Sequence, residues 1–254
     1  MKRIFLKVAY DGTAYCGFQF QPGDPTVEGE LNKALSVLTG EDTEVIGASR
    51  TDAGVHAMGN VAVFDTCSTI PAERFAAALN TKLPDDIRVT ESREVPDGWH
   101  PRKQECRKTY EYHIDNSRTG NPLRRLYTMH FPRRLDVERM REGALCLTGE
   151  HDFTSFANPS SQVLKNGGSA VRNIEEIRID GEPGGEITIT VRGNGFLYNM
   201  VRIIAGTLLD VGTGRFSPED MKMMISACDR TKAGITAEAK GLLLKGIDYQ
   251  EGTE

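Results

Sequence analysis

The sequence predicts an α+β protein of two subdomains, each with a mainly antiparallel sheet covered by helices. Segments with alternating apolar residues, typical of strands, are interspersed with segments whose apolar residues recur every three to four positions, typical of helices. The first hundred residues follow the order β-α-β-β-α-β, which builds an open sheet with helices on one face. The second half has a similar rhythm of elements.

The first element is a strand, because apolar residues alternate along the N-terminal segment MKRIFLKVAY. Lys7 interrupts the apolar part, so this segment does not read as a signal peptide. No apolar run approaches the roughly 20 residues that a membrane helix needs. Up to residue 105 we further expect a loop over residues 11–24, helices over residues 25–39 and from Pro71, and strands over residues 43–48, 60–65 and 87–95.

The two helices of this half carry clear end signals. Thr26 suits the N-terminus of the first and Gly40 its C-terminus, and Pro71 suits the first turn of the second. The apolar residues expected on the buried faces are Val27, Leu31, Ala34, Leu35 and Leu38 in the first helix and Phe75, Leu79 and Leu83 in the second.

The second half contains the most apolar helix, predicted over residues 197–210, with Arg202 off its apolar stripe. A capping box at Ser217 and Asp220 begins the last helix. The other expected elements are strands over 106–116, 126–131 and 242–247, a hairpin of 173–180 and 186–192, and a helix over 136–148. The simplest division is an N-terminal subdomain over 1–105 and a C-terminal subdomain over 106–254.

The five cysteines are odd in number and widely spaced, so we expect reduced thiols in core or boundary positions of a cytoplasmic protein, without a zinc site.

The net charge of −5 argues mildly against a polyanionic partner. However, residues 99–132 hold seven cations and three acids, and a local basic stripe matters more for phosphate binding than the global sum. The alternative for this stripe is a solvated charged face.

The most informative segment is GASRTDAGVHA, Gly47 to Ala57, which groups an arginine, hydroxyls, a carboxylate and a histidine around small residues. Asp52 is its candidate catalytic group. The alternative is a turn residue that accepts backbone N–H bonds, with Gly54 supplying an unusual backbone angle. A buried carboxylate stays ionised only when a cation or N–H donors face it, and Arg50 and Arg202 are the candidate cations.

Other patterns are weaker. His56 could be a base, although a structural or RNA-contacting histidine is the more common case, and the histidines show no metal-ligand spacing. Alternation places Tyr110 and Tyr112 on one face of a strand, where tyrosines usually pack within the sheet, although one at a cleft could stack on a planar base. The GNG triplet at Gly193–Gly195 lacks the rest of a dinucleotide fingerprint, and no P-loop is present.

These residues resemble the tRNA pseudouridine synthase A (TruA) family. Besides the Asp52 segment, further blocks resemble the family in its order: AYDGTAYCGFQ, TVEGEL, RKTYEYHI, GEHDFTSF, GNGFLYNMVR and GLLL. They span nearly the whole chain. The chain departs from the family pattern at three places. Asn60 stands where the family often has glutamine, Lys103–Glu105 where the family usually has a more aromatic segment, and Glu238 where proline is frequent.

The resemblance implies a pseudouridine synthase fold with its active-site cleft between the two halves. It further implies that Asp52 is catalytic, Arg50 replaces the flipped uridine in the stack, Tyr110 packs on the target ring and Arg202 pairs with the catalytic acid. No cofactor or metal is implied. Candidate RNA contacts are His56 and the basic residues Arg102, Lys103, Arg107, Lys108, Arg124 and Arg125.

The implied reaction is the isomerisation of uridine to pseudouridine at positions 38–40 of the tRNA anticodon arm by a cytoplasmic homodimer. It requires base flipping, which costs a few kcal/mol. Whether Asp52 adds covalently or removes a ribose proton to give a glycal stays open. The alternatives are a non-catalytic RNA-binding module and an aspartate-based phosphohydrolase, which would need a second acid and magnesium.

Overall fold

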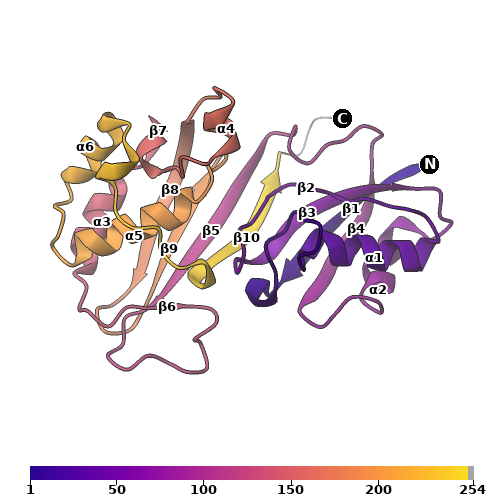
Figure 1. Cartoon of the computed structure of the whole chain (residues 1–254), viewed down its shortest axis with the longest axis horizontal. Coiled ribbons are helices and arrows are strands. Elements are labelled where there is room, and N and C mark those ends of the chain that lie inside the picture. Colours follow the sequence, from indigo (N-terminus) through magenta and orange to yellow (C-terminus); the bar gives the residue numbers. More distant parts are fainter. Residues whose placement is uncertain (251–254) are drawn as a thin grey trace. The chain divides into compact units, whose positions relative to one another are not determined.

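The computed structural model describes residues 1–250 and divides into two compact units (Figure 1). The first unit contains Met1–Cys106 and the chain from Leu244 onward, and the second contains Arg107–Leu243. No helix of the described residues is long and apolar enough to cross a membrane.

The sheet of the first unit has the strand order β4-β1-β3-β10, with the short strand β2 paired to β3. The strands are β1 (Lys2–Tyr10), β2 (Ile46–Gly47), β3 (His56–Thr66), β4 (Ile87–Val95) and β10 (Leu242–Tyr249). β1 is antiparallel to both β3 and β4, with Phe5 opposite Val63 and Arg93. One core cluster joins Phe5, Val61 and Val63 to Ile247 and Tyr249 of β10.

Two helices accompany this sheet: α1 (Val27–Thr39) and α2 (Phe75–Leu79), which contact each other (Figure 1). Thr26 caps α1, because its side chain accepts a hydrogen bond from the Gly29 N–H, and Gly40 ends it in the left-handed conformation. The predicted buried face is confirmed at Leu31 and Leu35, which are fully buried.

The second unit contains the strand order β5-β9-β8-β7, with the two-residue strand β6 (Met129–His130) parallel to β5. The strands are β5 (Cys106–Asp115), β7 (Gly149–Asp152), β8 (Val171–Gly181) and β9 (Glu186–Gly193). β8 and β9 form the predicted hairpin, and β9 is antiparallel to β5 with Val191 opposite Tyr110.

The helices of this unit are α3 (Val137–Leu145), α4 (Gln162–Lys165), α5 (Met200–Gly212) and α6 (Asp220–Ala227). α5 is buried on nearly every side and packs against α3. The capping box is confirmed, because the Ser217 N–H donates to the Asp220 carboxylate at 2.7 Å and the Asp220 N–H donates to the Ser217 hydroxyl at 3.3 Å.

The α+β class with mainly antiparallel sheets is confirmed, with several local differences. The strands expected at 43–48 and 126–131 shrink to two residues each, and β7 and α4 were not predicted. The last strand was expected in the C-terminal subdomain, but from Leu244 the chain groups with the first unit, where Ile247 and Tyr249 pack on the core around Phe5. All five thiols are free, but Cys67 and Cys228 are exposed, contrary to the expected core or boundary positions.

Candidate active site

Asp52 lies in a tight turn between β2 and β3 of the first unit. The Val55 N–H donates to the Asp52 carbonyl at 3.1 Å, and Gly54 has a φ of +75°, which favours glycine. Asp52 is half-buried, whereas Arg50 is exposed. The turn therefore places a carboxylate and a guanidinium outside the packed sheet, two residues apart.

Asn60 holds the start of this turn from the neighbouring strand β3. Its carboxamide oxygen accepts from the Ser49 N–H at 3.2 Å, and its carboxamide nitrogen donates to the Ser49 carbonyl at 2.9 Å. The side chain is fully buried, where hydrogen bonds are costly to leave unmade. The residue immediately before Arg50 is therefore fixed by both of its backbone polar groups.

A second contact fixes the residue between Arg50 and Asp52. The hydroxyls of Tyr10 and Thr51 are 2.7 Å apart, and both residues are buried. Asn60 connects the two contacts, because its nitrogen also lies 3.2 Å from the Tyr10 hydroxyl. This buried network of four side-chain and backbone positions pre-organises the turn that carries Asp52.

The loop that follows β1 braces the turn from the other side. Its Phe18 N–H donates to the Thr51 carbonyl at 3.1 Å, and the Gly54 N–H donates to the Tyr15 carbonyl at 3.2 Å. Gly17 has a φ of +102°, and a Cβ there would lie 2.7 Å from the Thr51 carbonyl oxygen. This loop can therefore approach the turn only because residue 17 has no side chain.

Arg50 shares its surroundings with Arg102 and Glu28, all in the first unit. Burial and the charge of Arg50 both lower the pKa of Arg102, and Glu28 partly offsets them. Burial raises the pKa of Glu28, while a hydrogen bond from the Phe20 N–H, at 2.6 Å, and the charges of Arg102 and Arg50 lower it. Two cations and one acid thus lie beside the Asp52 turn.

His56 is buried at the start of β3. Its Nδ1 atom lies 3.1 Å from the Gly12 N–H donor and 3.1 Å from the Asp11 carboxylate. This arrangement supports a structural role for the ring in the loop after β1, rather than the surface position that an RNA contact would need.

In the second unit, Tyr110 lies on β5 and is buried. Its ring meets Phe196 edge-to-face, with centroids 5.3 Å apart and planes at 86°. Tyr112, two residues further along the same face, is fully buried, and its hydroxyl donates to the Glu238 carbonyl at 2.8 Å. Burial raises the pKa of Tyr112 above its usual value.

Arg202 lies on α5 and is half-buried. Its Nε atom donates to the Ala237 carbonyl at 2.8 Å, and the Ala237 N–H donates to the Arg202 carbonyl at 3.1 Å. This reciprocal pair fixes the stem of the side chain. An arginine on so apolar a helix is expensive to place, so the contact with Ala237 explains part of how the fold accommodates it.

The cations of the basic stripe differ in their ion pairing and in their exposure. Arg107 forms an ion pair with Glu175, and Arg124 pairs with Glu186 at 2.5 Å. Lys103 and Arg125 are exposed, and Lys108 is half-buried. The glutamates come from β8 and β9, so two of the predicted phosphate-binding cations are partly neutralised within their own unit.

The structure places Arg50 and Asp52 in the first unit, and Tyr110 and Arg202 in the second. The positioning roles of Asn60, Tyr10 and Thr51 were not predicted from the sequence. A usable signal was present for Asn60, because a carboxamide inside the apolar strand run NVAVF must find partners when it is buried.

Comparison with known proteins decides the family. The profile described as tRNA pseudouridine synthase matches residues 7–102 and 144–250. The chain belongs to the tRNA pseudouridine synthase family. The profile segments contain Asp52 and Arg202, whereas Tyr110 lies between them.

Curated relatives align over nearly the whole chain. A tRNA pseudouridine synthase A of Brevibacillus brevis is 46% identical over 249 residues, covering 98% of this chain and 100% of the relative. The protein of that name from Bacillus subtilis is 45% identical over 249 residues, covering 97% and 99%. A tRNA pseudouridine synthase A 2 of Clostridium perfringens is 45% identical, covering 98% and 100%. The family resemblance of the sequence is confirmed, and this synthase is an isomerase.

Proposed function

We propose that this synthase converts uridine to pseudouridine at positions 38–40 of the tRNA anticodon arm, with Asp52 as the catalytic carboxylate. The observation that carries the proposal is the turn itself: Asp52 projects from a segment whose neighbours Ser49 and Thr51 are fixed by buried hydrogen bonds. A carboxylate held this firmly can meet a reacting atom without further reorganisation.

The reaction breaks the bond between uracil N1 and ribose C1′, turns the base and forms a bond from C5 to the same carbon. A proton leaves C5 and one returns to N1, so no atom is gained and no electron is transferred. Asp52 either adds to the nucleotide or removes a ribose C2′ proton. Both routes use an ionised carboxylate, for which Arg202 is the proposed cationic partner.

Base flipping is the second part of the proposal. Arg50, exposed two residues before Asp52, is the group proposed to fill the gap left by the flipped uridine. Tyr110, braced edge-to-face by Phe196, is proposed to pack against the freed uracil while it turns. Its buried setting restricts the ring to one orientation, which suits a flat partner.

The decisive experiment incubates unmodified tRNA with wild type, Asp52→Ala and Asp24→Ala, and maps pseudouridine at each position. Asp24 is an exposed acid of the neighbouring loop, so its variant controls for the loss of one negative charge. We expect tRNA binding by all three proteins but no product with Asp52→Ala, a loss of at least about a thousandfold in rate.

Near-wild-type activity in Asp52→Ala would end the assignment. A wild-type protein that binds tRNA without making pseudouridine would support a non-catalytic RNA-binding module. Magnesium-dependent phosphate release would support a phosphohydrolase.

We further propose, from the family, that the synthase works as a cytoplasmic homodimer. Light scattering coupled to size exclusion tests the dimer, for which we expect twice the chain mass of 28.0 kDa. Detection of the protein in fractionated cells tests the location.

A further inference from the structure

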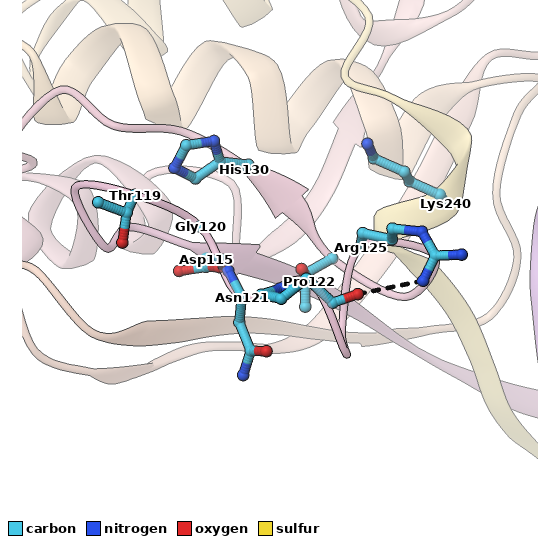
Figure 2. A pocket seen from close by; sticks show the side chains of 9 residues that line it. Asp115, Thr119, Gly120, Asn121, Pro122, Arg125, His130 and Lys240 are labelled. Atoms are coloured by element: carbon cyan, nitrogen blue, oxygen red, sulfur yellow. Dashed lines mark hydrogen bonds between the residues drawn. The ribbon is translucent and has the colours of Figure 1, made fainter.

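The second unit contains a pocket that no part of the proposed reaction uses (Figure 2). It has a volume of about 390 Å³, within the range of small-ligand pockets. Its walls come from the end of β5, the following loop, β6 and the segment before β10. Its lining residues include Asp115, Gly120, Arg125, His130 and Lys240.

The loop that forms this pocket is held by the Asp115 carboxylate. One of its oxygens accepts from the Ser117 N–H at 3.0 Å and from the Ser117 hydroxyl at 2.5 Å, and the other accepts from the Asn121 N–H at 2.6 Å. Burial alone would raise the pKa of Asp115, but these hydrogen bonds and His130 lower it below its usual range. The acid is therefore ionised and occupied with the loop backbone.

His130 forms a second fixed wall. Its Nε2 atom lies 2.9 Å from the Ser117 carbonyl oxygen. Gly120 has a φ of +74°, and a Cβ there would lie 3.3 Å from the imidazole ring. The loop therefore packs closely on the ring, and the pocket is a built feature rather than a gap between mobile side chains.

Two cations face this pocket from distant parts of the sequence. Arg125 is exposed, and within the described residues its guanidinium has one hydrogen-bonding partner, the neutral Pro122 carbonyl at 3.1 Å. Lys240 pairs with Glu238 at 2.8 Å, and the three donors of its ammonium allow further contacts beside that pair. Figure 2 shows Arg125 and Lys240 on the side of the pocket away from His130.

Arg124, the residue before Arg125, has different surroundings. Arg124 carries the same charge, but its guanidinium is 2.5 Å from the Glu186 carboxylate. Arg125 lines the pocket and keeps donors available, whereas Arg124 is paired with Glu186 and is not among the lining residues. A planar guanidinium with free donors and an ammonium, both lining one pocket, match the oxygens of a phosphate.

We infer that this pocket binds a phosphodiester of the tRNA backbone, through Arg125 and Lys240. The inference rests on the proposed function, because it takes tRNA as the substrate.

The position of the pocket in its own unit predicts which step it serves. Asp115 is five residues beyond Tyr110 on the extended strand β5, roughly 17 Å away at the usual rise per residue. The bound phosphate therefore belongs to a nucleotide other than the one proposed to react, and the contact should strengthen binding without changing the chemical step.

The test compares Arg125→Gln with the matched control Arg124→Gln, and with Lys240→Gln. Binding of unmodified tRNA is measured over a series of salt concentrations, and kcat is measured at saturating tRNA. We expect Arg125→Gln to weaken binding about fivefold and to reduce the salt slope by about one, with kcat unchanged. Lys240→Gln should have a smaller effect of the same kind, and Arg124→Gln almost none.

A neutral methylphosphonate placed at single positions of the tRNA identifies the phosphate. At the contacted position it should weaken binding to wild type but not weaken binding to Arg125→Gln any further. Equal affinities and salt slopes for Arg125→Gln and Arg124→Gln would overturn the inference.

Binding of inorganic phosphate tests whether the pocket instead takes a small free anion. If Arg125→Gln loses binding of inorganic phosphate while its tRNA affinity and salt slope stay at wild type, the pocket serves a small anion and the inference fails. The result is separate from the tests of the proposed function, which fails if wild type makes no pseudouridine or if Asp52→Ala keeps near-wild-type activity. An Arg125-specific loss of tRNA affinity supports the pocket in either case.

Discussion

Asn60 is the residue whose removal best separates positioning from folding. Asn60→Ala deletes the two hydrogen bonds to Ser49 and the link to Tyr10, so the turn that carries Arg50 and Asp52 loses its bracket. We expect kcat to fall about a hundredfold, because small displacements of a reacting group are costly, and the free energy of unfolding to fall by about 1–3 kcal/mol. Steady-state kinetics and denaturant titration measure the two effects.

Asn80 supplies the matched control for this prediction. Its side chain brackets Val89 in the same way, donating to the carbonyl and accepting from the N–H, both at 2.8 Å. Asn80 is half-buried, so Asn80→Ala should destabilise the protein by the same mechanism but somewhat less, while kcat stays near wild type. If both variants lose the same activity, the loss reflects folding rather than the position of Asp52.

At the scale of elements, the loop after β1 determines how the Asp52 turn is supported. Gly17→Ala introduces a Cβ 2.7 Å from the Thr51 carbonyl oxygen, whereas Gly23, in the same loop with a φ of +88°, has open space around it. Both substitutions strain a left-handed backbone by roughly 1 kcal/mol, but only the first pushes the turn. We expect a small loss of melting temperature in Gly23→Ala, a larger loss in Gly17→Ala, and a loss of kcat in Gly17→Ala alone.

The melting temperatures and kcat of the two glycine variants decide this prediction. Equal activities would mean that the turn keeps its place without the loop, and that Asn60 and Tyr10 suffice to hold it.

The sequence predicted those elements whose signals are local. Thr26 and Gly40 mark the two ends of α1, and the apolar period of α5 predicted a helix that is buried almost throughout. The segments at 43–48 and 126–131 were overestimated, because a few apolar residues form a strand only where a partner strand is available. Each of these segments pairs with a neighbour over two residues only.

The candidate site was predictable in part for the same reason. The composition of the Gly47–Ala57 segment marked Asp52 directly. Its support by Asn60 and Tyr10 depends on strand register, in which Tyr10 lies opposite Ala57 and Val8 opposite Asn60, and register is not visible in either strand alone. The pairing of Arg124 with Glu186 is likewise a contact over 62 residues that the charge pattern did not reveal.

At the scale of the whole molecule, the chain leaves its first unit at Cys106 and returns to it at Leu244. The first unit is therefore completed only when the last strand is in place. Ile247 and Tyr249 pack on the core that contains Phe5 and Val63. The Tyr249 ring lies 5.1 Å from the Trp99 ring, and its hydroxyl donates to the Pro101 carbonyl at 3.0 Å.

Tyr249→Ala tests this assignment. The substitution removes an aromatic side chain and its hydrogen bond from the core of the first unit, so we expect a loss of about 2 kcal/mol in the free energy of unfolding. Tyr127→Ala, at an exposed tyrosine of the second unit, should cost less than about 0.5 kcal/mol. Because local stability is set by the unit in which a contact lies, hydrogen exchange in Tyr249→Ala should accelerate in β1, β3 and β4 but not in β8 and β9. Acceleration confined to β8 and β9 would instead place the last strand with the second unit, as the sequence alone had suggested.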